Sequence, residues 1–102
     1  MTNIYLENRL VLEDTENKTM VAPIELEYYL VESEFSSLDG PAGIKIYGIG
    51  IIKKTNDKHS EGEMIVDFSS SIHQTREVLG KLAGNSVTPV ALKSILEDMI
   101  DI

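Results

Sequence analysis

The sequence predicts an α+β fold, in which an antiparallel sheet of about four strands forms a meander and two C-terminal helices pack on one of its faces. Up to about residue 68, short segments rich in β-branched and aromatic residues alternate with polar or glycine-containing stretches. The last part of the chain instead has apolar residues at helical spacing. A chain of 102 residues can bury one core, so we expect a single domain over residues 1–102.

Four segments carry the strand prediction, with expected spans of 4–12, 23–32, 44–54 and 63–68. The first is apolar but does not alternate cleanly, so it is predicted as an edge strand or an extended arm. The second alternates, and its residues spaced by two share one face while Glu25 and Glu27 face water. The residues of that shared face are Ile24, Leu26, Tyr28 and Leu30.

Glycines mark the third predicted strand. Gly48 and Gly50 lie on one face of it, where the missing Cβ atoms either leave a groove or permit a bulge. Polar residues 55–62 then predict a hairpin loop, and Met64, Val66 and Phe68 are expected on one side of the fourth strand. Residues 13–18 and 35–43 are predicted as a polar connection and a flexible loop.

Two helices are predicted at 72–83 and 89–100. Ser71 and Gln74 have the spacing of a capping box, and Thr88 followed by Pro89 is typical of a helix start. Gly84-Asn85 supplies residue types that end a helix in a left-handed conformation. An apolar face completes the second helix, with residues at helical spacing: Leu92, Ile95, Leu96, Met99 and Ile100.

The composition excludes several classes of function. Nine basic against 17 acidic residues give a net charge of −8, which disfavours binding to nucleic acid phosphates. The absence of cysteine excludes disulfides, thiol nucleophiles and thiolate metal sites. No apolar run is long enough to cross a bilayer and no secretory signal is visible, so we expect a cytoplasmic protein without a membrane partner. The acidity indicates either a solvated surface or a patch that attracts a basic partner.

No catalytic, cofactor-binding or metal-binding residues are predicted. His59 and His73 are the only histidines, and neither stands in a metal-binding spacing. Glu25 and Glu27 share one strand face, which could hold a cation or an acid–base pair, but a solvated sheet face explains them more simply. The serines at 69–71 lack the context of a serine nucleophile and fit helix capping.

The leading hypothesis is therefore a non-enzymatic interaction or regulatory protein that binds a protein partner or associates with itself. Two adjacent tyrosines on one strand point to opposite faces, so one is expected in the core and the other on the surface. The candidate interaction surface comprises Tyr28, Tyr29, Tyr47, Glu25 and Glu27. One alternative is a small-molecule-binding or enzymatic domain with a pocket between sheet and helices, near Gly48 and Gly50; another is an acidic mimic of nucleic acid.

Several stretches together resemble a family of small uncharacterised bacterial proteins, about the length of this chain, from anaerobic Gram-positive bacteria. The resemblance extends from about residue 20 to the C-terminus, and the Val-Thr-Pro helix start is its most distinctive part. It implies a cytoplasmic bacterial protein and no activity, because the family is a domain of unknown function. The stretches are Glu27-Tyr28-Tyr29-Leu30, Tyr47-Gly48-Ile49, Leu82-x-x-Asn85-x-Val87-Thr88-Pro89-x-x-Leu92 and Leu96-Glu97-Asp98.

Overall fold

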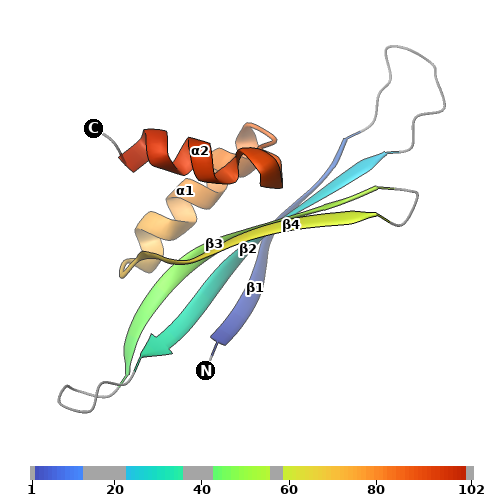
Figure 1. The fold of residues 1–102 in the computed structure, drawn as a ribbon. Coiled ribbons are helices and arrows are strands. Elements are labelled where there is room, and N and C mark those ends of the chain that lie inside the picture. Colours follow the sequence, from blue (N-terminus) through green and yellow to red (C-terminus); the bar gives the residue numbers. More distant parts are fainter. Residues whose placement is uncertain (1, 13–22, 36–42, 56–58, 101–102) are drawn as a thin grey trace.

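Four antiparallel strands are followed by two helices that lie on one side of the sheet (Figure 1). The structure, a computed structural model, describes residues 2–12, 23–35, 43–55 and 59–100. The strands are β1 (Thr2–Leu12), β2 (Ile24–Phe35), β3 (Ile44–Lys54) and β4 (Ser60–Ser69), in the order β1-β2-β3-β4. The predicted α+β meander is thus confirmed, and the first segment is a paired outer strand rather than an arm.

The strands extend beyond several of their predicted ends. Ser60, Glu61 and Gly62 pair with Lys54, Lys53 and Ile52, so these three residues belong to β4 and not to the hairpin loop. Their polar sequence carries no strand signal, and the ladder with β3 determines their conformation. The predicted connection at 13–18 and residues 36–42 of the predicted loop lie outside the described residues.

Helix α1 (Ile72–Gly84) starts at the predicted cap. The backbone N–H of Gln74 donates to Ser71 Oγ at 3.2 Å, which confirms Ser71 as the N-cap. The Gln74 side chain does not return to the cap as in a standard capping box; its Oε1 accepts from Ser69 Oγ at 3.0 Å. Ser69 Oγ in turn accepts the N–H of Ser71, so a serine relay connects the end of β4 to α1.

The end of α1 differs from the prediction. Ser86, not Gly84 or Asn85, has the left-handed conformation, with φ of +51°. The N–H groups of Ser86 and Val87 donate to the carbonyls of Ala83 and Leu82, the bonding pattern of a Schellman motif. Helix α2 (Pro89–Ile100) then begins at Pro89, as predicted from Thr88-Pro89.

Both helices cover the sheet face that carries Tyr28. The predicted apolar alternation of β2 is confirmed, because Leu26, Tyr28 and Leu30 are almost completely buried. Tyr28 Oη also donates to the carbonyl oxygen of Val87 at 2.7 Å, which joins the sheet to the connection between the helices. The core on this face consists mainly of Leu26, Tyr28, Leu30, Ile49, Ile51, Leu79, Leu82, Leu92 and Leu96.

An irregularity in the ladder between β3 and β4 corrects the predicted face of β4. The register shifts between Tyr47 and Ile49, and a Cβ on Gly48 would lie only 2.7 Å from the Val66 Cα atom. The missing Cβ therefore permits the bulge that was one of the two predictions for this glycine. Ile65, opposite Ile49 before the shift, contacts the core, and so does Phe68 after the shift, whereas Met64 and Val66 stay exposed.

Candidate functional site

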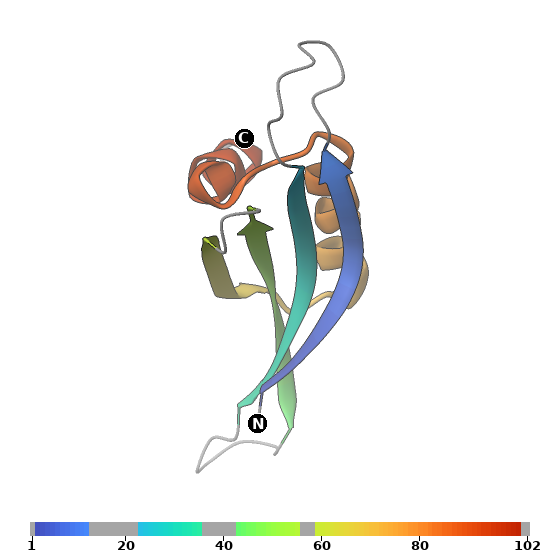
Figure 2. The ribbon, with the colours of Figure 1, turned by 90° about the vertical axis from the view of Figure 1, so that its right-hand side faces the viewer.

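The sheet face opposite the helices, called the open face below, carries apolar side chains from all four strands. The ladder places Ile4 opposite Val31 and Leu6 opposite Tyr29, and these residues point away from the helices. β3 contributes Gly50 and Ile52, and β4 contributes Met64. No described helix lies on this face (Figure 2).

Large apolar side chains of the open face remain in contact with solvent. The exposed fractions are 51% for Ile4, 50% for Leu6 and 45% for Met64. Val31 is fully buried although it is not part of the core beneath the helices, so its neighbours on the open face already shield it. Exposed apolar residues that gather on one face are typical of an interaction site, whereas scattered ones are normal.

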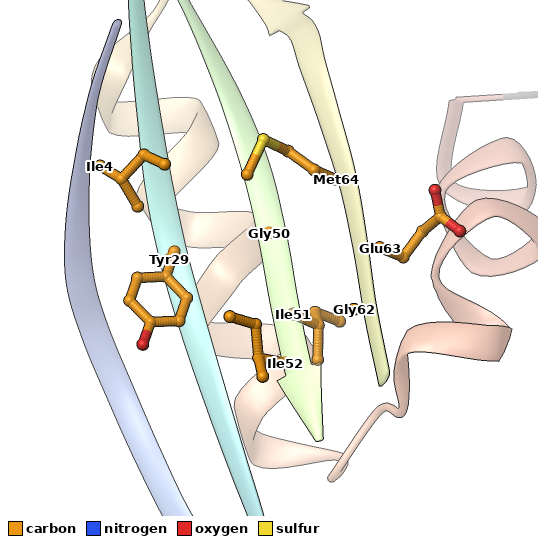
Figure 3. A pocket seen from close by; sticks show the side chains of 8 residues that line it. All are labelled: Ile4, Tyr29, Gly50, Ile51, Ile52, Gly62, Glu63 and Met64. Carbon is orange, nitrogen blue, oxygen red and sulfur yellow. The ribbon is translucent and has the colours of Figure 1, made fainter. Parts of the chain in front are cut away.

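A hollow of about 580 Å³ lies at the centre of this face (Figure 3). Gly50 lies at its centre, Tyr29 and Ile4 lie on one side of that glycine, and Met64 lies on the other. A Cβ added to Gly50 would be 3.7 Å from Tyr29 Cβ and 3.8 Å from Met64 Cε, so the glycine leaves open the space of a side chain. The hollow is predominantly apolar and could receive an apolar side chain or the body of a small ligand.

Two ion pairs border the apolar part of the open face. Arg9 Nε donates to Glu25 Oε1, and Lys54 Nζ lies 2.9 Å from Glu27 Oε1. The hydrogen bond and charge of Arg9 hold the pKa of Glu25 below its ordinary value, and Glu27 raises the pKa of Lys54. Burial, followed by a hydrogen bond to Glu27, raises the pKa of Tyr29. Two positive and two negative groups thus compensate each other at this end of the face.

The predicted surface residues do not all lie together. Tyr29, Glu25 and Glu27 are on the open face, but Glu27 is only 7% exposed, because it lies between strands and pairs with Lys54 instead of facing water. Tyr28 is in the core, as the prediction that one of the two tyrosines is buried requires. Tyr47 packs against the core on the helix side of the sheet and is not part of the open face.

The open face also includes residues that the sequence did not single out, chiefly Ile4, Leu6 and Met64. For Ile4 and Leu6, the sequence of β1 did contain an indication, because its apolar residues follow one another without alternation. A strand that is apolar on both faces indicates that both faces avoid water. Met64 lies on this face because the regular part of the β3–β4 ladder sets it opposite Gly50.

The hollow differs in location from the pocket predicted between sheet and helices, which stays a prediction. Gly50 lines it, as expected, but it lies on the side of the sheet away from the helices, because side chains of the core occupy the space between the layers. Gly48 does not line it, since the backbone of β4 crosses that glycine.

We searched the described residues for clusters of metal ligands and for helices that could span a membrane. His59 and His73 are exposed, and no three potential ligands come together within 2–12, 23–35, 43–55 and 59–100. Neither helix, in the part of the chain that the structure describes, is long and apolar enough to cross a membrane.

Residues 7–102 match the model of a family of unknown function, DUF6514. The match begins earlier than the resemblance predicted from about residue 20, and it confirms the expected family of small uncharacterised proteins. The bacterial origin that the resemblance implies stays a prediction. No curated protein and no solved structure matches the chain.

Proposed function

We infer the function of this chain from its own surface, because the chain belongs to the family of unknown function DUF6514 and this membership assigns no activity. We propose that it is a non-enzymatic binding module whose open face receives an apolar segment of a protein partner. The observation that carries this proposal is the exposed apolar surface on a sheet with helices on only one of its faces. The cytoplasmic location expected from the sequence stays a prediction.

The chemistry of the open face supports an apolar partner segment. Tyr29 and Met64 flank the hollow at Gly50, and aromatic residues and methionine are enriched where proteins meet. An apolar side chain of the partner would enter this hollow as an anchor, and the surrounding exposed residues would exclude water from it. The carboxylates of Glu25 and Glu27 are already paired with Arg9 and Lys54 within the protein, so contact at this end of the face does not have to bury them unpaired.

Capture experiments with matched variants test the proposal. Wild-type protein, Met64→Lys and Val90→Lys would each be used as bait with a lysate of the native host. Met64→Lys places a charge beside the hollow, whereas Val90, 85% exposed on α2, receives the same kind of change away from the open face. We expect a partner that binds wild type and Val90→Lys but not Met64→Lys. A partner that binds all three proteins equally would place the contact elsewhere.

The hollow itself supports a second candidate, a small-molecule-binding domain. Its volume of about 580 Å³ is within the range of ligand pockets, and Tyr29 supplies a hydroxyl group beside apolar walls. A ligand that binds the folded state raises its Tm. In a metabolite screen, this candidate predicts a compound that stabilises wild type but not Gly50→Leu, whose added side chain would occupy the hollow. A screen without such a compound would favour the protein partner.

A further inference from the structure

Besides the open face, the fold leaves a second surface uncovered among the described residues: the outer edge of the sheet at β1. Within the described residues, β1 pairs with β2 alone, and Figure 2 shows it as the outermost strand at its end of the sheet. Such an edge presents backbone N–H and C=O groups that can pair with a further strand. β1 has 11 residues, so the edge is not limited by the very short strand length that is one of the ways in which proteins protect a sheet edge.

The side chains of β1 favour contact on both faces of this edge. Ile4 and Leu6 point to the open face and Tyr5 to the helix side, yet all three are 45–51% exposed. Helix α1 contacts β1 but does not shield these residues from solvent. Five of the large exposed apolar residues belong to this one strand: Ile4, Tyr5, Leu6, Val11 and Leu12.

Charge determines which edge can pair with its own copy. β1 carries one acidic and one basic residue, and both are compensated within the protein, Glu7 by Arg76 and Arg9 by Glu25. The other outer strand, β4, carries three carboxylates and no basic residue: Glu61, Glu63 and Asp67. Two copies of β4 would repel each other, whereas two copies of β1 would not.

We propose that two copies of this chain pair through β1, antiparallel to each other, about a two-fold axis perpendicular to the sheet near Glu7 and Asn8. The irregularity after Leu6 places Ile4 and Leu6 on the open face before it, and Arg9 and Val11 on the same face after it. Pairing that keeps residues of one face together sets Ile4 opposite Val11 of the second copy. It also sets Tyr5 opposite Leu10 of the second copy, and the symmetry repeats both apolar pairs.

This dimer goes beyond the proposed binding function, because it uses the strand edge rather than the open face. The two sheets would join into one of eight strands, with all helices on the same side. The two open faces would then form one continuous surface for a partner. The dimer would thereby present two copies of the hollow at Gly50.

Single introduced cysteines test the arrangement cleanly, since the chain contains none. Asn8→Cys would place two thiols beside the axis, where a short thiol crosslinker joins them. Thr2→Cys is the matched control at the strand end, because antiparallel pairing sets the two copies of residue 2 about 35 Å apart. We expect a covalent dimer with Asn8→Cys and none with Thr2→Cys; crosslinking of Thr2→Cys instead would overturn the antiparallel pairing.

Sedimentation at concentrations from micromolar to millimolar measures whether the chain forms dimers and whether they depend on the β1 edge. We expect wild type and Val90→Lys to form dimers, and Tyr5→Lys to raise the dimer dissociation constant at least about tenfold. Tyr5 points away from the open face, so this variant should keep its protein partner, and circular dichroism would verify its fold. A wild type that stays monomeric over this range, or a dimer that Tyr5→Lys leaves unchanged, would overturn the proposal without affecting the proposed function.

Discussion

Tyr28 joins the two layers of the fold through one hydroxyl group. Its ring is buried in the core, and its Oη donates to the Val87 carbonyl at 2.7 Å. Tyr28→Phe keeps the ring but leaves that carbonyl unpaired in the core, so we expect the free energy of unfolding to fall by about 1–2 kcal/mol. Denaturant unfolding measures this change. Tyr5→Phe removes the same atom from an exposed residue and should be nearly neutral, and equal effects of the two variants would contradict the role of the Val87 bond.

Gly48 and Gly50 are two residues apart on one strand, yet they should respond differently to the same substitution. A Cβ at Gly48 would collide with the β4 backbone, 2.7 Å from Val66 Cα, whereas the nearest atom to a Cβ at Gly50 is 3.7 Å away. Because backbone cannot rotate aside as a side chain can, Gly48→Ala should lower the free energy of unfolding by about 3 kcal/mol. Gly50→Ala should change it by less than about 1 kcal/mol. Similar thermal unfolding of the two variants would refute the close crossing of β4.

The Arg9–Glu25 pair predicts a pH dependence with a definite sign. Arg9 lowers the pKa of Glu25 in the folded protein, so the unfolded chain binds the proton more readily. The stabilisation is therefore complete above the unfolded pKa of about 4.3 and is lost as the pH falls through the lower folded pKa. In urea titrations, wild type should be more stable than Glu25→Gln at neutral pH, and the difference should shrink below about pH 4. Combining this variant with Arg9→Gln isolates the pair; a difference that does not depend on pH would count against it.

In the connection between the helices, the conformation of one residue, Ser86, ends helix α1. Ser86 adopts φ of +51° at the end of α1, a conformation that costs a side-chain-bearing residue more than glycine. We expect Ser86→Gly to raise the free energy of unfolding by about 0.5–1 kcal/mol, measured by thermal denaturation. Ser94→Gly, in the exposed interior of α2, should instead lower it by about 0.5 kcal/mol. Destabilisation by Ser86→Gly would show that the serine side chain has a role there.

Elements with a clear periodic pattern or cap could be predicted from the sequence, and those set by pairing could not. The alternation of β2, the cap at Ser71 and the helix start at Pro89 are local signals, and the structure follows them. The polar start of β4 has no local signal, since its ladder with β3 places it in the sheet. The left-handed conformation was predicted for Gly84-Asn85 because glycine and asparagine adopt it most easily. The structure has it at Ser86, because the hydrogen bonds of the Schellman motif determine which position takes that conformation.

At the scale of the whole molecule, the sequence predicts the layers but not the choice of face. Tyr28 and Tyr29 were expected on opposite faces, and only the packed structure shows that the helices cover Tyr28. The open face could be predicted in part, through Tyr29 and the glycines. Its contributions from Ile4 and Met64 depend on strand register, because the ladder on the N-terminal side of the irregularity after Leu6 sets Ile4 opposite Val31 and the β3–β4 ladder sets Met64 opposite Gly50.

The distribution of charge over the molecule predicts how two kinds of partner would respond to salt: an apolar segment bound to the open face, or a basic protein bound to the acidic surface. The net charge is −8, but the open face carries compensated pairs at Glu25 and Glu27 beside an apolar centre. Salt at about 1 M shortens the Debye length to about 3 Å and weakens contacts between exposed charges, while apolar contacts persist. A partner captured through the open face should therefore remain bound at high salt, and mass spectrometry of low-salt and high-salt captures measures this. A partner released by salt, and still bound by Met64→Lys, would indicate that the acidic surface is the binding site and would favour mimicry of nucleic acid.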